Sequence, residues 1–283
     1  MPYAVSAYRE AAAVLAEASE FLASRPAEHH VIATLLGLRA ATGAEGRYWI
    51  VRDDGGTCVG LVVQSPLTFA ATLTPMPREA ARAVVAAIVA DGVSLPGVNG
   101  EVATAAAFAG HWAEVRRVGA RPLIGMRLQQ LGHLRHPEGV PGHDRAARPG
   151  DLDVLRRWMD DFAAFTNEPP ASEADVLHRI EEGQLSVREV DGVAVCLVGH
   201  TAPMSGLVRI GPVFTPPEHR RHGYAGACVA SVSAHALSQG HGCILYTDLG
   251  NPTSNSVYRA LGYGTISETI RYAFDESSTN ALP

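Results

Sequence analysis

A strand, a basic loop and a helix are predicted to meet in the stretch Val213–Gly226, which reads VFTPPEHRRHGYAG. The apolar residues before Thr215 suit a strand, and an alanine-rich helix is predicted to begin at Gly223. A helix N-terminus offers free backbone N–H groups and the positive end of the helix dipole, which together bind phosphate. The small residues of the loop would let a pyrophosphate approach the backbone. A helix cap packed with small residues is the alternative interpretation of the same letters.

A second motif follows the next predicted strand, in the stretch Asn251–Tyr263, which reads NPTSNSVYRALGY. Its spacing places Ser254 three residues after Asn251 and Tyr258 four residues later, and the stretch ends in a glycine and an aromatic residue. Two motifs in this order, each after a strand, favour a binding site over a simple helix cap.

These two motifs carry a resemblance to a known family. The Arg-x-x-Gly-x-Ala spacing of residues 220–225 resembles the acyl-CoA signature of the GCN5-related N-acetyltransferase (GNAT) superfamily, and residues 251–263 resemble the second motif of that superfamily. The resemblance covers roughly residues 146–274. It implies an α/β (α+β) fold with a mixed, mostly antiparallel sheet flanked by helices, and acetyl-CoA as the co-substrate with no metal.

The resemblance also implies roles for individual residues. The backbone of Val213 and Thr215 would pair with the pantetheine arm, and the N–H of Val213 would polarise the thioester carbonyl. Tyr258 would protonate the leaving thiolate. Glu168 lies in the loop that covers the acceptor site in this superfamily, and either Glu168 or a chain of waters would take the proton of the acceptor amine; the alternative is that Glu168 only faces solvent. The residues expected at the cofactor are Val213, Phe214, Thr215, Arg220, Arg221, His222, Gly223, Tyr224, Ala225, Gly226, Asn251, Ser254, Asn255 and Tyr258.

Hydrophobic periodicity predicts a similar order of elements in the two halves of the chain. In the first half the predicted helices are 8–24, 28–42, 78–90 and 101–118, and the predicted strands are 48–51, 58–63, 69–73 and 123–131. In the second half the predicted helices are 151–165, 172–183, 223–238 and 252–261, and the predicted strands are 185–190, 193–200, 207–215, 243–247 and 265–274. Chance or an ancient duplication could produce this echo, and the agreement of several elements favours duplication.

The first half repeats the order of elements without the phosphate-binding loop. After Thr74 the chain reads Pro75-Met76-Pro77, with no glycine, and Glu79 would repel a phosphate. The glycines and prolines of residues 132–150 indicate a linker. We therefore expect tandem GNAT-like lobes: a degenerate N-terminal lobe at 1–135 that shapes the acceptor pocket, a linker at 136–145, and a catalytic domain at 146–283.

The charge of the chain limits its partners. The formal net charge is −6, and all 23 basic residues are arginine. Residues 1–145 carry 13 arginines and 13 acidic residues, whereas residues 146–283 carry 10 arginines and 16 acidic residues, so the second half holds the whole excess. Nucleic-acid binding is not expected, because neutralising phosphates needs a basic surface. An acidic acceptor side favours a cationic small molecule or a peptide amine as the acceptor.

The remaining patterns predict absences. The four cysteines are scattered among apolar neighbours, which is typical of buried free thiols in a reducing compartment. The N-terminus carries acidic residues and resembles no signal peptide, and no apolar run is long enough to span a membrane, so we expect a cytoplasmic protein. The histidines at 133, 136, 143, 219 and 222 lie in loops without cysteine or aspartate at ligand spacing, so no metal site is expected.

The sequence therefore predicts an acetyl-CoA-dependent N-acetyltransferase, a monomer or homodimer, in which an amine attacks the thioester directly in a ternary complex. The alternative is a domain that binds acyl-CoA without turnover, as a sensor or scaffold. The presence of Tyr258 favours the enzyme.

Overall fold

The computed structural model describes residues 3–166 and 170–275. Contacts divide the chain into two compact units. Unit 1 comprises Met1–Leu128, Asp248–Gly250 and Ile266–Pro283, and unit 2 comprises Gln129–Thr247 and Asn251–Thr265.

The described residues of the first half, 3–131, form ten helices and strands. They are β1 (Tyr3–Tyr8), α1 (Ala11–Ser24), α2 (Pro26–Thr42), β2 (Arg47–Asp53), β3 (Cys58–Gln64), β4 (Ala71–Leu73), α3 (Arg78–Ala90), β5 (Gly97–Glu101), α4 (Val102–Arg116) and β6 (Gly119–Leu131).

The second half repeats this order element by element. Its members are β7 (His143–Ala146), α5 (Leu152–Thr166), α6 (Glu173–Glu181), β8 (Leu185–Val190), β9 (Val193–His200), β10 (Leu207–Phe214), α7 (Tyr224–Ser238), β11 (Gly242–Asp248), α8 (Pro252–Leu261) and β12 (Tyr263–Asp275). The complete repetition among the described residues favours the duplication that the sequence suggests.

The sheet of each unit has the same pairing pattern. In unit 1, β1 to β4 pair antiparallel, β4 and β5 pair parallel, and β12 pairs antiparallel with β5. In unit 2, β7 to β10 pair antiparallel, and β10 pairs parallel with β11. The predicted fold class, a mixed and mostly antiparallel sheet with helices on it in each lobe, is confirmed.

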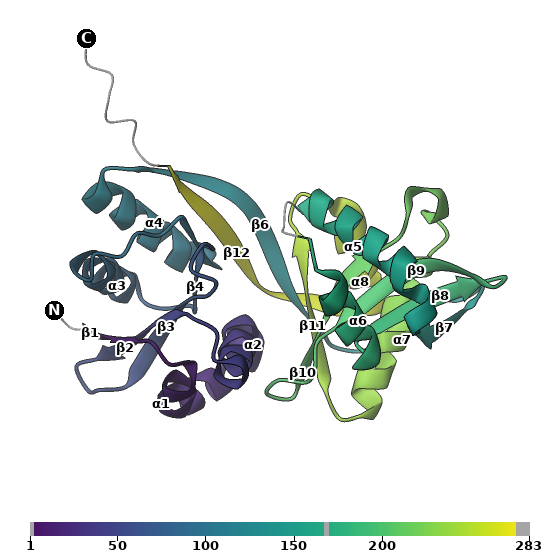
Figure 1. Cartoon of the computed structure of the whole chain (residues 1–283), viewed down its shortest axis with the longest axis horizontal. Coiled ribbons are helices and arrows are strands. Elements are labelled where there is room, and N and C mark those ends of the chain that lie inside the picture. The colour runs from purple at the N-terminus through teal and green to yellow at the C-terminus, as the bar shows by residue number, and fades with distance from the viewer. Residues whose placement is uncertain (1–2, 167–169, 276–283) are drawn as a thin grey trace, which may run out of the picture. The chain divides into compact units, whose positions relative to one another are not determined.

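Helices cover both faces of each sheet because alternate strand residues are apolar on both sides. In unit 1, Trp49 and Val51 of β2 pack with α3 and α4 on one face of the sheet. The alternate residues Tyr48 and Ile50 are also buried. Helix α1 contacts β1, β2 and β3. Figure 1 shows α3 and α4 on one side of this sheet and α1 and α2 on the other.

In unit 2 the same division separates two cores. The core under α7 and α8 contains Cys196 and Val198 of β9. The core under α5 and α6 contains Leu197, the residue between them. Successive side chains of β9 therefore lie on opposite faces of the sheet, in one core or the other. The polar side chains of the candidate site lie at the ends of β10 and β11.

Two strands belong to both units. Residues 119–128 of β6 and 266–275 of β12 lie in unit 1, whereas Gln129–Leu131 and Tyr263–Thr265 lie in unit 2. These units do not coincide with the ranges 1–135, 136–145 and 146–283 expected from the sequence. The expectation placed a linker where glycine and proline accumulate, but residues 143–146 of that region form β7 and pair with β8. The last strand of the chain completes the sheet of unit 1.

Candidate active site

The strands β10 and β11 part in the middle of unit 2. Their parallel register runs from Leu207 opposite Gly242 to Ile210 opposite Leu245, while β10 continues to Phe214 along β9. A register shift lies between Ile210 and Val213, and Pro212 cannot donate to a neighbouring strand. The backbone of the last residues of β10 therefore faces a gap in the ladder, where an extended ligand can add hydrogen bonds as a strand would.

The basic loop that follows β10 ends in a left-handed backbone. Arg221 has φ of 69° and Gly223 has φ of 81°. Gly223 is the N-cap of α7, and no described side chain caps this helix start. The first N–H groups of α7 are therefore free to bind an anion, which the helix dipole also favours.

Positive charge surrounds this helix start. Arg220, Arg221 and His222 are exposed, and Nε of Arg220 donates to the carbonyl oxygen of Thr215 at 3.0 Å, which fixes the turn out of β10. The rings of His222 and Tyr224 stack at 5.2 Å. The donor set and the glycine backbone fit a pyrophosphate.

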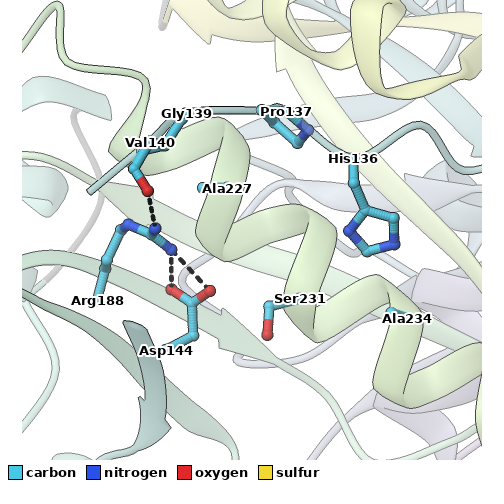
Figure 2. Close-up of a pocket in the computed structure, with 9 residues that line it drawn as sticks. All are labelled: His136, Pro137, Gly139, Val140, Asp144, Arg188, Ala227, Ser231 and Ala234. Carbon is cyan, nitrogen blue, oxygen red and sulfur yellow. Dashed lines mark hydrogen bonds and ion pairs between the residues drawn. The ribbon is translucent and has the colours of Figure 1, made fainter. Parts of the chain in front are cut away.

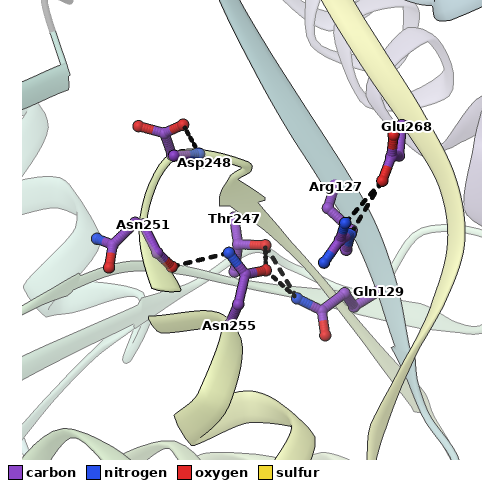
Figure 3. Close-up of polar contacts among 8 residues, drawn as sticks. Arg127, Gln129, Thr247, Asp248, Asn251, Asn255 and Glu268 are labelled. Atoms are coloured by element: carbon purple, nitrogen blue, oxygen red, sulfur yellow. Dashed lines mark hydrogen bonds and ion pairs between the residues drawn. The ribbon is translucent and has the colours of Figure 1, made fainter. Parts of the chain in front are cut away.

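A buried polar network holds the start of α8 next to β11. The side chain of Asn251 caps α8 by accepting from the N–H of Ser254 at 3.0 Å. Asn255 donates to the carbonyl oxygen of Asn251 at 2.8 Å and accepts from the hydroxyl of Thr247 at 2.8 Å. Gln129 of β6 donates to that same hydroxyl oxygen at 2.9 Å. As Figure 3 shows, side chains from α8 and β6 thus converge on Thr247 of β11, and these contacts fix the position of α8.

Tyr258 lies one turn after Asn255 on α8. It is 8% exposed, and its ring meets the ring of Tyr263 edge-on at 6.1 Å. Its hydroxyl makes no hydrogen bond to any described residue. Burial raises the pKa of Tyr258 far above its ordinary value, and the thiol of Cys196 acts in the same direction. The phenol therefore stays protonated at neutral pH and is available to donate.

The structure brings most of the predicted site residues together. Tyr224 and Tyr258 belong to one apolar cluster of unit 2, and Val213 and Ala225 pack against it. Phe214 differs, because its side chain lies in the opposite core, against Trp158 of α5 at 6.3 Å. Only the backbone of Phe214 is thus on the side of the gap. Glu168 lies outside the described residues.

A loop that the sequence assigned to the linker forms one wall of this site. Val140 lies against Gly223, and Pro137 lies near Gly226. Arg188 of β8 holds this loop, because its guanidinium donates to the carbonyl oxygens of Val140, Pro141 and Gly142 at 2.9, 3.0 and 3.2 Å.

The charge of Arg188 is balanced by Asp144 of β7. Nη1 of Arg188 lies 2.9 and 2.8 Å from the two carboxylate oxygens of Asp144. Figure 2 shows this pair at a cavity of about 310 Å³ beside α7. The sequence analysis missed this pair. The signal that could have indicated it is an arginine inside the predicted strand 185–190, because a charged side chain buried in a sheet needs a partner.

The side chain of Thr215 contacts a cysteine of β9. The hydroxyl of Thr215 donates to Sγ of Cys196 at 3.3 Å. The hydrogen bond from Cys228 lowers the pKa of Cys196, with Thr215 acting in the same direction, whereas the pKa of Cys228 is raised by this pairing and by burial. All four cysteines are free thiols, as predicted. Three of them are buried, but Cys58 is only half-buried, whereas all four were expected to be buried.

The equivalent place in unit 1 has different chemistry. After β4 the N–H of Met76 donates to Oγ1 of Thr104 at 3.2 Å, and Pro75 and Pro77 have no N–H. The cap of α4 is Glu101, which accepts from the N–H groups of Ala103 and Thr104 at 3.0 Å each. However, α4 corresponds to α8, and the counterpart of α7 is α3, which begins after Pro77 and also has no side-chain cap. The start of α3 differs from that of α7 because it has no glycine and carries Glu79 in its first turn, which would repel a phosphate.

Two possible features are not found in the part of the chain that the structure describes. No helix there combines the length and the apolar character needed to cross a membrane. No group of three or more His, Cys, Asp or Glu residues is arranged there to hold a metal ion.

Comparison with known proteins identifies the fold. A family model described as "FR47-like protein" matches residues 200–272, which contain both motifs. A GNAT-family acetyltransferase from Colwellia psychrerythraea superposes with a TM-score of 0.59 at 12% identity, over 96% of this chain and 100% of that chain. A GCN5-related N-acetyltransferase from Sphaerobacter thermophilus superposes with a TM-score of 0.62 at 17% identity, over 96% of this chain and 95% of that one.

A tandem GNAT protein from the clavulanic acid biosynthesis pathway shares the fold as well, with a TM-score of 0.52 at 14% identity, over 83% of this chain and 84% of that chain. No curated protein has a sequence that matches the chain. The solved structures show that the chain has the GNAT fold, repeated in its two halves, and residues 200–272 match the FR47-like family model.

Proposed function

We propose that the chain is an acetyl-CoA-dependent N-acetyltransferase that binds its co-substrate in unit 2. The observation that carries the proposal is the uncapped start of α7 at Gly223, beside the exposed Arg220 and Arg221 and next to the gap between β10 and β11. The free helix start suits a pyrophosphate, and the gap between the strands suits the extended pantetheine arm. The corresponding helix start of unit 1, at Pro77, has no glycine and carries Glu79 in its first turn, which favours one molecule of acetyl-CoA per chain.

The residues of unit 2 divide the work of acyl transfer. The thioester of acetyl-CoA supplies the activated acyl group. The backbone N–H of Val213 polarises the carbonyl oxygen, which gains negative charge as the amine nitrogen attacks. The N–C bond forms as the C–S bond breaks, and the phenol of Tyr258 gives its proton to the departing sulfur. The phenolate then regains a proton from solvent.

The acceptor is an amine of a small molecule or a peptide. The amine must lose its proton to attack, and Glu168 or a chain of waters takes that proton. The acidic excess of residues 146–283 favours a cationic acceptor over an anionic one. We further propose that the protein acts in the cytoplasm, where a reducing environment keeps its four thiols free.

A second candidate function is binding of acyl-CoA without turnover, as a sensor or scaffold. The unbonded hydroxyl of Tyr258 favours the enzyme, because a protein that only binds has no use for a buried proton donor at the sulfur.

Two measurements separate the candidates. Titration of the full chain with CoA in a calorimeter should give one site per chain, and two equivalent sites would contradict the assignment to unit 2. Release of the thiol from acetyl-CoA, followed with a panel of primary amines, should depend on the amine. Tight CoA binding without thiol release for every amine would favour the sensor.

A further inference from the structure

Unit 1 contains a cavity that the proposed chemistry does not use. Its volume is about 750 Å³, and every residue that lines it belongs to unit 1. The walls come from the end of α1, the start of α2, the first residues of β3, the loop after β4, the start of α4 and residues 266–268 of β12. This volume suits a small organic molecule.

One wall of the cavity is His29, which is 1% exposed. Nδ1 of His29 lies 3.0 Å from the carbonyl oxygen of Phe21 and 3.3 Å from that of Leu22. Carbonyl oxygens only accept hydrogen bonds, so Nδ1 carries the proton. Burial lowers the pKa of His29, so the ring is neutral and Nε2 holds a lone pair.

That lone pair has no hydrogen-bond partner among the described residues. The ring itself is fixed, because it stacks on Phe21 with centroids 4.5 Å apart. An acceptor of a residue that lines a cavity, with no partner in the protein, is available to a donor from a ligand.

The charged side chains of the wall also favour a ligand whose hydrogen-bond donor is a cation. Glu28, next to His29, has a side chain that is 21% exposed, and it pairs with Arg25 only at 3.8 Å, where Arg25 is itself 61% exposed. The other two carboxylates of the wall are engaged, Glu101 in capping α4 and Glu268 with Arg127 at 2.8 Å. Glu28 is thus the carboxylate with capacity for a cation.

The rest of the wall includes apolar surface, and its three glutamates outnumber its one arginine, Arg25, which disfavours an anion. Phe21, Val59 and Met76 line it. The N–H of Met76 is taken by Thr104, and its neighbours on either side are prolines, so the loop has no backbone donor for a phosphate or carboxylate. A ligand for this cavity carries an apolar body and a group that donates hydrogen bonds.

We propose that this cavity of unit 1 binds a small primary amine in its ammonium form, with Nε2 of His29 accepting one N–H and Glu28 supplying the opposite charge. The site lies in the lobe without the phosphate loop, so the inference goes beyond the proposed function and does not depend on acetyl transfer. The apolar part of the amine packs on Phe21 and Met76.

The test is calorimetric titration of the full chain, without acetyl-CoA, using phenethylamine as the probe. Phenylacetate, of similar size but opposite charge, is the matched ligand. Phenethylamine should bind one site per chain, and phenylacetate should not bind. Glu28→Gln should weaken phenethylamine about 10- to 100-fold, the loss of one charge-assisted hydrogen bond. Glu114→Gln, an exposed carboxylate of α4 outside this wall, should have no effect.

His29→Asn tests the acceptor itself. The asparagine amide can still donate to the carbonyl oxygens of Phe21 and Leu22, but it has no atom at the position of Nε2. Binding should fall as for Glu28→Gln, and in the parent protein the ¹⁵N shift of Nε2 should move when phenethylamine is added. This spectrum needs no variant, so it holds even if His29→Asn does not fold.

Several results would overturn the inference. One is equal binding of phenylacetate, and another is unchanged binding in Glu28→Gln. A static Nε2 resonance at saturating phenethylamine, or no binding at millimolar phenethylamine, would equally exclude the site. None of these depends on thiol release, so the proposed function and this inference can fail separately.

Discussion

Val140 lies directly over Gly223, since a β-carbon built on Gly223 would come within 3.1 Å of Cγ2 of Val140. Two segments that are far apart in the sequence therefore meet at the start of α7. The φ of 81° at Gly223 is one that side-chain-bearing residues rarely adopt. The backbone thus favours a glycine here, and the valine methyl leaves little room for a β-carbon, whatever ligand the loop holds.

Gly223→Ala should lower CoA affinity by about tenfold or more. The left-handed backbone costs an L-residue about 1–2 kcal/mol, and relaxing it moves the N–H groups that face the pyrophosphate. Gly240→Ala is the matched control, because Gly240 has nearly the same φ, of 80°, with open space around it. Both variants should lose similar stability in calorimetry, but only Gly223→Ala should lose CoA binding. Equal CoA affinity in the two variants would exclude this loop as the anion site.

Tyr258→Phe should lower turnover by up to about 100-fold and leave CoA affinity nearly unchanged. The fall in turnover should stay near this limit, because a thiolate can leave without being protonated first. Tyr263→Phe is the control, because its hydroxyl bonds to Ser233 at 2.8 Å in the core. That variant should lose stability and keep its turnover. Unchanged kcat in Tyr258→Phe, with the chemical step shown to be rate-limiting, would exclude Tyr258 as the acid.

Arg188→Met should destabilise unit 2 by about 3–5 kcal/mol, because it leaves Asp144 buried and unpaired. The side chains of this pair are only 6% and 15% exposed. Adding Asp144→Asn should recover part of the loss in thermal unfolding, since the uncompensated charge is gone. CoA binding should stay weak in the double variant, because the loop that carries Val140 has lost its guanidinium. Full recovery of CoA affinity would show that the loop needs no such support.

The pH dependence of stability should reveal the pair of Arg145 and Asp151. Nη1 of Arg145 lies 2.7 Å from a carboxylate oxygen of Asp151, and this hydrogen bond lowers the pKa of Asp151. A carboxyl whose folded pKa is lowered stabilises the protein above its unfolded value of about 3.9 and loses that contribution as pH falls through the folded value. Asp151→Asn should therefore cost about 1–3 kcal/mol at pH 7. The difference from the parent protein should persist down to about pH 4 and shrink below it. A difference that grows on acidification would contradict the pairing.

Local patterns predicted the second half of the chain more completely than the first. The strands 185–190 and 193–200 and the helix 252–261 match the structure, because Asp191 and Gly192 form a turn with positive φ and Asn251 caps the helix. The strand β5, with the sequence GVNGE, was missed. Two glycines and an asparagine disfavour a strand, and it forms because β4 and β12 pair with it on both sides.

For the site, the motifs located the loop at Gly223 and the cap at Asn251, since both depend on local backbone and helix-end chemistry. Motif spacing could not predict that Val140 forms a wall of the site, nor that Thr215 donates a hydrogen bond to Cys196. Both are contacts between residues far apart in the chain, set by how the sheet of unit 2 closes.

The passage of β12 into unit 1 has a consequence for how the protein is made. Residues 269–273 pair with β5, so the first lobe lacks a strand until residues near 273 have left the ribosome. Until then β5 exposes an unpaired edge, which is prone to join other strands. A truncation after β6 should therefore yield an aggregating fragment, and the two halves should be recovered as folded protein when they are translated together.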